Sequence, residues 1–190
     1  MGVSHYLPRT LEIAMFRSLH IGAVIAALAT PALAHVTLET TEARIGTPYK
    51  AVLRVPHGCE DAATIALRVR IPDGVIAVKP MPKPGWTLTT VTGKYEKTYT
   101  FFHNAKLSEG VVEIIWSGGK LPDAWYDEFV FSAFLAGDLE AGKTLYFPVV
   151  QECEKGVHRW IEIPAAGKTP ADYPEPAPGL RLLPASSPRP

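Results

Sequence analysis

The chain has 190 residues, 47% of them hydrophobic, and equal numbers of basic and acidic side chains, 19 of each, give a formal net charge of zero. This balance argues against a nucleic-acid-binding protein, because phosphate backbones are bound by clustered Lys and Arg, whereas these residues are scattered singly here. The length suits one domain that follows an N-terminal leader.

The N-terminal segment has the pattern of a secretory signal peptide. Two arginines precede an apolar run, residues 21–33, which ends in the small-residue pattern Ala-Leu-Ala before His35. The run is too short for a transmembrane helix, which needs about 20 apolar residues. We therefore expect residues 1–34 to be removed by cleavage after Ala34. Translation from Met15 would leave the same cleavage site. The mature protein would be periplasmic or secreted, would begin with His35 and would have no membrane span.

The rest of the chain contains many short β-branched or aromatic runs bounded by Gly, Pro and Asp, with almost no helical periodicity. In one of them the apolar Leu67 and Val69 alternate with Arg68. Runs at this spacing predict an all-β protein, an antiparallel β-sandwich of immunoglobulin-like type, with a barrel as the alternative. The predicted strands are 36–41, 49–55, 64–71, 75–79, 86–91, 95–103, 111–117, 129–135, 144–151 and 157–163.

The domain is expected to occupy residues 35–167. From residue 168 onward the composition changes to Pro, Ala and Ser. Such a segment cannot bury enough apolar surface to offset the entropy lost on ordering. We therefore predict a Pro-rich flexible tail over residues 168–190.

Cys59 and Cys153 are the two cysteines of the chain, and both lie in the part expected to be exported. Export brings thiols into an oxidising environment, which favours one disulfide between them. The alternative is that a cysteine thiolate binds a metal ion.

Cleavage after Ala34 would give His35 a free α-amine beside its imidazole. The amine nitrogen and Nδ1 of one residue can close a six-membered chelate ring around a metal, and the amine gives up its proton readily to a divalent ion. Two nitrogens and a carboxylate oxygen suit Cu(II), which has the highest affinity among the divalent ions of the first transition row. The alternative is that cleavage leaves a histidine first by chance.

Other copper chemistries fit the residues less well. A blue-copper site needs a free cysteine with two histidines, and a Cu(I) carrier needs several thioether sulfurs, whereas Met81 is the one methionine after residue 34. A copper oxidase with a histidine brace would need His57, His103 or His158 to bind the same copper as His35. The sequence has no nucleophile elbow and no glycine-rich phosphate loop. We therefore do not expect an enzyme.

Several segments together carry a family resemblance: the opening His35-Val36-Thr37, the strand and turn Leu53–Glu60, the turn Lys83–Trp86, the strand Phe129–Phe131 and the strand that holds Trp160. In these segments the chain resembles the YcnI-type copper-binding domain of exported bacterial proteins, formerly a domain of unknown function. The resemblance implies a cupredoxin-like β-sandwich that holds one Cu(II) per chain in a single-histidine brace. It implies as ligands the N-terminal histidine and a glutamate that follows a Val-Pro turn, with a tryptophan near the metal.

On this resemblance His35 is the metal-binding histidine and Trp160 is the tryptophan near the metal. Glu60 matches the glutamate if a short insertion is allowed, Asp61 is its immediate competitor, and His57 is a third candidate ligand. The structural alternatives are a solvated turn carboxylate for Glu60, a surface histidine for His57 and a packing residue for Trp160.

The resulting functional hypothesis is an exported Cu(II)-binding protein that acts as a copper chaperone or sequesters copper. Its expected partners are the copper ion and a membrane copper transporter or another periplasmic copper carrier, and no nucleic acid. A hypothesis of a different class is a metal-free β-sandwich that serves as a scaffold or adhesion module in the cell envelope. The two hypotheses differ in whether changing His35 has a biochemical consequence.

Overall fold

The computed structural model describes residues 1–2 and 35–186, and the regular structure in the second range is nearly all β-strand. Apart from its first two residues, the predicted signal peptide lies outside the described residues, and so does Ala34 at the predicted cleavage site. No helix within the described ranges is long and apolar enough to cross a membrane.

The alternation of apolar and polar residues along the sequence becomes an alternation of buried and exposed side chains. In β4 (Thr64–Arg70), Leu67 and Val69 are fully buried whereas Arg68 is exposed. β3 (Pro48–Val55) follows the same rule over most of its length. Each of these two strands therefore has one apolar face, which must be covered by a second layer.

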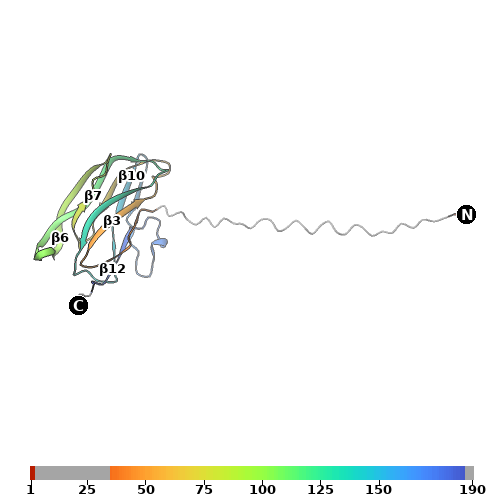
Figure 1. Cartoon of the computed structure of the whole chain (residues 1–190). Helices are drawn as coiled ribbons and strands as arrows, with labels where there is room; N and C mark the ends of the chain where they lie inside the picture. The colour runs from red at the N-terminus through yellow and green to blue at the C-terminus, as the bar shows by residue number, and fades with distance from the viewer. Residues whose placement is uncertain (3–34, 187–190) are drawn as a thin grey trace. The chain divides into compact units, whose positions relative to one another are not determined.

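Two antiparallel sheets supply these layers (Figure 1). One has the strand order β1-β3-β8-β5 and the other has the order β11-β10-β4-β7-β6. Besides β3 and β4, the strands of these two sheets are β1 (Thr37–Leu38), β5 (Val75–Pro80), β6 (Thr87–Thr100), β7 (Lys106–Leu121), β8 (Asp127–Leu135), β10 (Val149–Cys153) and β11 (Val157–Trp160). The predicted all-β sandwich is confirmed.

Aromatic side chains from the two sheets meet in the core. Phe129 of β8 lies with its ring edge-on to Trp116 of β7, at 5.5 Å between ring centroids, and both side chains are fully buried. Phe131 of β8 is likewise buried and lies 6.0 Å from Phe147. The main apolar cluster includes residues of both sheets, so the sheets share one core.

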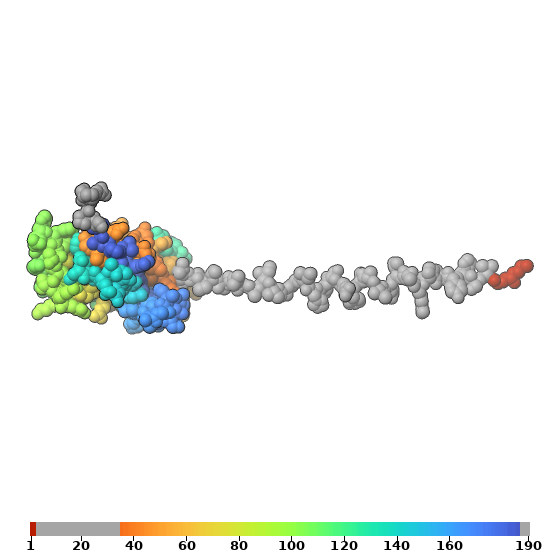
Figure 2. All heavy atoms as spheres, turned by 90° about the horizontal axis from the view of Figure 1, so that it is seen from below, coloured from red at the N-terminus to blue at the C-terminus, as the bar shows by residue number. Residues whose placement is uncertain are grey.

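The prediction of a flexible tail over residues 168–190 is wrong for much of that segment. Residues Gly179–Leu183 form β12, the central strand of a third sheet, and Leu180 and Leu182 are buried. The neighbours of β12 are β2 (Glu42–Arg44), which is parallel to it, and β9 (Thr144–Tyr146), which is antiparallel. In Figure 2 the dark blue C-terminal segment accordingly lies among orange and cyan surfaces. The Pro-rich average composition concealed a short alternating strand that has its own apolar face.

Strand boundaries also differ from the predicted ones. The predicted strands 86–91 and 95–103 form one strand, β6, which ends in the short 3-10 turn η1 (Phe102–Asn104). The predicted strand 144–151 is divided between β9 and β10, which belong to different sheets. Pro148 lies between these two strands and has no N–H to donate to a ladder. A second 3-10 turn, η2 (Pro170–Asp172), precedes β12.

Candidate functional site

His35 lies at the open edge between the two main sheets. It precedes β1, the edge strand of one sheet, and its imidazole packs on Trp160, which ends β11, the edge strand of the other. The two ring centroids are 5.2 Å apart and the ring planes are inclined by 51°. Trp160 is buried, whereas His35 is half-buried. The structure thus brings together the histidine and the tryptophan that the sequence analysis selected.

A cavity of about 190 Å³ adjoins His35. Its other lining residues are Thr37, Arg54, Pro56 and Tyr126. The β1–β3 register sets Thr37 directly opposite Arg54, which explains why these two residues share one wall. The cavity therefore offers an imidazole, a guanidinium and a phenol, and none of its lining residues is a carboxylate.

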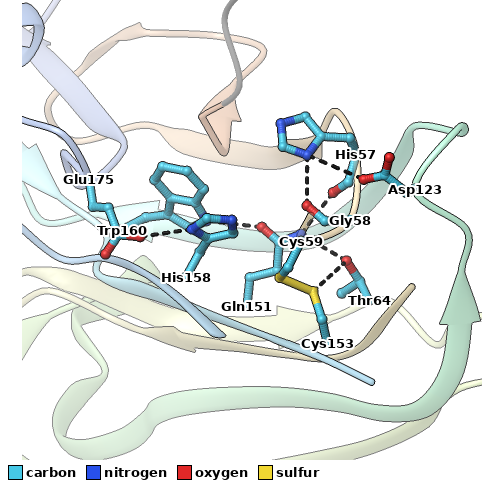
Figure 3. The surroundings of a disulfide bond; sticks show 10 residues. All are labelled: His57, Gly58, Cys59, Thr64, Asp123, Gln151, Cys153, His158, Trp160 and Glu175. Carbon is cyan, nitrogen blue, oxygen red and sulfur yellow. Dashed lines mark hydrogen bonds and ion pairs between the residues drawn. A yellow bond between two sulfur atoms is a disulfide. The ribbon is translucent and has the colours of Figure 1, made fainter. Parts of the chain in front are cut away.

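A buried hydrogen-bond network holds the indole of Trp160 (Figure 3). The indole Nε1–H donates to Oε1 of Gln151 at 3.0 Å. The amide nitrogen of Gln151 donates to the carbonyl oxygen of His57 and to the hydroxyl oxygen of Thr64, each at 2.8 Å. Gln151 and Thr64 are the only buried polar side chains in the described part of the chain. Gln151 therefore connects Trp160 with the backbone of the segment next to Pro56.

His158 contacts the indole of Trp160 as well. Its ring stacks on the indole, with centroids 4.8 Å apart and planes inclined by 28°. Its Nδ1 lies 2.8 Å from a carboxylate oxygen of Glu175, and the other oxygen of Glu175 accepts the backbone N–H of Arg159. The sequence analysis considered His158 only as a possible second histidine ligand of a copper oxidase. Its position two residues before Trp160 on one strand, which places both side chains on the same face, was the available signal.

Glu60 and Asp61 are the two central residues of a tight turn. Cys59 and Ala62 exchange both backbone hydrogen bonds across it, at 2.9 and 2.8 Å. Both central residues have positive φ, 45° for Glu60 and 70° for Asp61, as a type I′ turn requires, and both side chains are exposed. Neither residue lines the cavity beside His35. The assignment of Glu60 as a metal ligand stays a prediction.

The predicted disulfide between Cys59 and Cys153 is confirmed, and no cysteine of the described residues is free. The bond ties the start of the tight turn to the end of β10 (Figure 3). It therefore removes the alternative in which a thiolate binds a metal. It also fixes the turn close to Thr64, whose hydroxyl oxygen lies 3.8 Å from the sulfur of Cys153.

His57 lies two residues before Cys59, and its ring contacts differ from those of its carbonyl oxygen, which accepts from Gln151. Its Nδ1 is 2.6 Å from the carbonyl oxygen of Gly58 and 3.7 Å from a carboxylate oxygen of Asp123. These contacts occupy one ring nitrogen. His57 follows Pro56, which lines the cavity beside His35, but His57 itself does not line it.

The described residues contain no group of three or more His, Cys, Asp or Glu side chains that could hold a metal ion together. A metal ion at His35 could therefore not be bound by a cluster of described side chains and would need other donor groups. The imidazole of His35 is one donor, and the α-amine that cleavage after Ala34 would create is a second donor from the same residue. The two nitrogens of this donor set fit Cu(II), and no carboxylate oxygen comes from the residues that line the cavity.

Comparison with known proteins identifies a family and a related structure. The model of the family described as "Domain of unknown function (DUF1775)" matches residues 35–182, so the chain belongs to this family. A crystal structure of an uncharacterized protein from Nocardia farcinica, described as revealing an immunoglobulin-like fold, is 29% identical in sequence. The alignment covers 78% of this chain and 98% of that one, with a TM-score of 0.55. No curated protein matches the chain.

Proposed function

We propose that this member of the DUF1775 family is an exported protein that binds one Cu(II) ion at His35 and carries or sequesters it without catalysing a reaction. The observation that carries the proposal is the position of His35, which is half-buried against Trp160 and lines a cavity. The family match also begins at residue 35, where cleavage of a signal peptide would leave a new α-amine.

The chemistry of the site supports copper in its divalent state. An α-amine and an imidazole on one residue give a compact pair of nitrogen donors, and nitrogen donors favour Cu(II) over the other divalent ions of the first transition row. No free cysteine is present among the described residues, which leaves no thiolate for a blue-copper site. The half-buried position of His35 suits exchange, because a partner copper carrier could approach a metal held at the edge of the sandwich.

Cu(II) titration followed by electron paramagnetic resonance tests the proposal. The mature protein that begins at His35 is compared with a form that carries one extra N-terminal alanine, which converts the amine to an amide and keeps every side chain. His103→Gln is the matched control, because His103 is an exposed histidine on the η1 turn. We expect one Cu(II) with nitrogen hyperfine structure in the mature and control proteins and its loss in the extended form.

The same titration decides between the two classes of function. Equal binding by all three proteins would exclude the brace and point to a copper site elsewhere, such as one at His57. Binding by none would leave the metal-free envelope module as the better hypothesis. The observation that favours that module is that the described side chains form no metal-binding cluster of three or more groups. A Glu60→Gln variant in the same experiment shows whether Glu60 supplies an oxygen ligand, through a changed spectrum at equal stoichiometry.

A further inference from the structure

We propose that the cavity beside His35 binds a small carboxylate from solution, held by the guanidinium of Arg54, and that this carboxylate supplies the oxygen donor of the copper site. The part that concerns copper rests on the proposed function. The part that concerns anion binding stands on the cavity alone, since its lining residues include a cation and no carboxylate.

Arg54 is a cation without an acidic partner among residues 35–186. It is exposed on β3, and no carboxylate oxygen of the described residues lies within 4.0 Å of its nitrogens, unlike Arg68, which is paired with Glu152 at 2.7 Å. A guanidinium presents its N–H donors as a planar fork that matches the two oxygens of a carboxylate. The free fork of Arg54 on a cavity wall is therefore a suitable anchor for an external carboxylate.

The nearest acidic side chains already have other partners. Glu128 faces Arg54 across the β3–β8 pair, but its carboxylate accepts the hydroxyl of Tyr126 at 3.3 Å. Asp127 forms an ion pair with Lys83 at 2.6 Å. In the structure neither carboxylate lies within 4.0 Å of the guanidinium nitrogens of Arg54. The guanidinium therefore has its donors available for an anion from solution.

The walls of the cavity suit a ligand of a few heavy atoms. Pro56 supplies an apolar surface, and the hydroxyl of Thr37 and the phenol of Tyr126 supply further polar contacts. Cu(II) on the two nitrogens of His35 would add positive charge close to that of Arg54. Two cations that border one cavity repel each other, and a bound anion between them removes this repulsion. Copper and carboxylate should therefore bind cooperatively.

Acetate is the probe for the test, titrated against chloride at constant ionic strength. In the metal-free mature protein, the NMR signal of the Arg54 side-chain Nε–H is followed, and Arg54→Gln identifies that signal by its absence. Arg70→Gln is the matched control, because Arg70 is also an exposed strand arginine but lines a different cavity. In the copper-loaded protein, carboxyl-¹³C acetate is used, and electron–nuclear double resonance detects ¹³C bound next to Cu(II).

We expect saturable shifts at Arg54, a ¹³C coupling in the copper-loaded protein, and a loss of about tenfold in acetate affinity in Arg54→Gln but not in Arg70→Gln, as expected for one lost charge-assisted contact. Absence of both the shifts and the coupling overturns the proposal. The proposal is also overturned if acetate leaves the copper spectrum unchanged and the Glu60→Gln substitution removes its oxygen-ligand signal. Glu60 would then be the oxygen ligand. If copper fails to bind while acetate still shifts Arg54, the copper function is refuted and the anion site remains.

Discussion

Replacing Gln151 by leucine should destabilise the protein strongly, because this one amide satisfies polar groups on two sides of the candidate site. Gln151 is 1% exposed and Trp160 is 2% exposed, so water cannot replace the amide as the partner of the indole N–H. The leucine leaves the indole N–H of Trp160 and the carbonyl of His57 without their present partners. Each orphaned buried group costs about 1–3 kcal/mol. Because the leucine regains some apolar burial, we expect a net loss of about 2–4 kcal/mol.

Urea unfolding of the mature protein measures this loss, with the m-value checked for constancy. Glu152→Gln is the matched control on the same strand, because the exposed ion pair of Glu152 with Arg68 is worth at most about 1 kcal/mol. In the double variant Gln151→Leu with Trp160→Phe, both hydrogen-bond partners become apolar. Its loss should therefore be smaller than the sum of the two single losses. A Gln151→Leu protein within about 0.5 kcal/mol of wild type would refute this account of the network.

Three further predictions concern the fold around the site. Replacing both Cys59 and Cys153 by serine should lower the free energy of unfolding by up to about 4–5 kcal/mol, since the bond closes a loop with a sequence separation of 94 residues; unchanged urea unfolding would contradict this. The buried Tyr49 hydroxyl donates to the carbonyl oxygen of Thr40, and burial raises the pKa of this hydroxyl. The contribution of Tyr49 to the free energy of unfolding is therefore complete below the ordinary tyrosine pKa of about 10 and declines as pH rises above it. Tyr49→Phe should flatten this alkaline loss of stability in thermal unfolding measured from pH 8 to 11, and an unaltered slope would show that other groups cause the loss. Truncation after residue 178, which removes β12 with the buried Leu180, should abolish cooperative unfolding, whereas truncation after residue 183 should leave it intact; equal behaviour of the two truncated forms would contradict a structural role for β12.

Part of the candidate site could be predicted because the evidence for it is local in sequence. The cleavage pattern before His35 gives that residue its expected chemistry, and the alternation in β11 places Trp160 on an apolar face. The disulfide needed no geometry either, since a chain that is expected to be exported and has two cysteines has one possible pairing. In each case a few neighbouring residues contain the physical cause.

The remaining features depend on contacts between distant segments. His158 has an ordinary sequence context, and only the folded chain brings Glu175 to its ring nitrogen. Arg54 is one exposed strand arginine among several, and it gains its possible role from the cavity that it shares with His35. Gln151 is likewise distinguished by its burial and its three partners, which come from different parts of the chain.

The sequence by itself determined the β-strand content, the sandwich class and the disulfide, because strand alternation and cysteine pairing act through composition and short-range pattern. Only the tertiary structure decided that residues 179–183 form a central strand and that Glu60 does not line the cavity beside His35. The physical reason is that strand pairing and the lining of a cavity depend on the strand edges and sheet faces that stay uncovered after the two sheets pack. A local sequence pattern does not indicate which edges and faces these are.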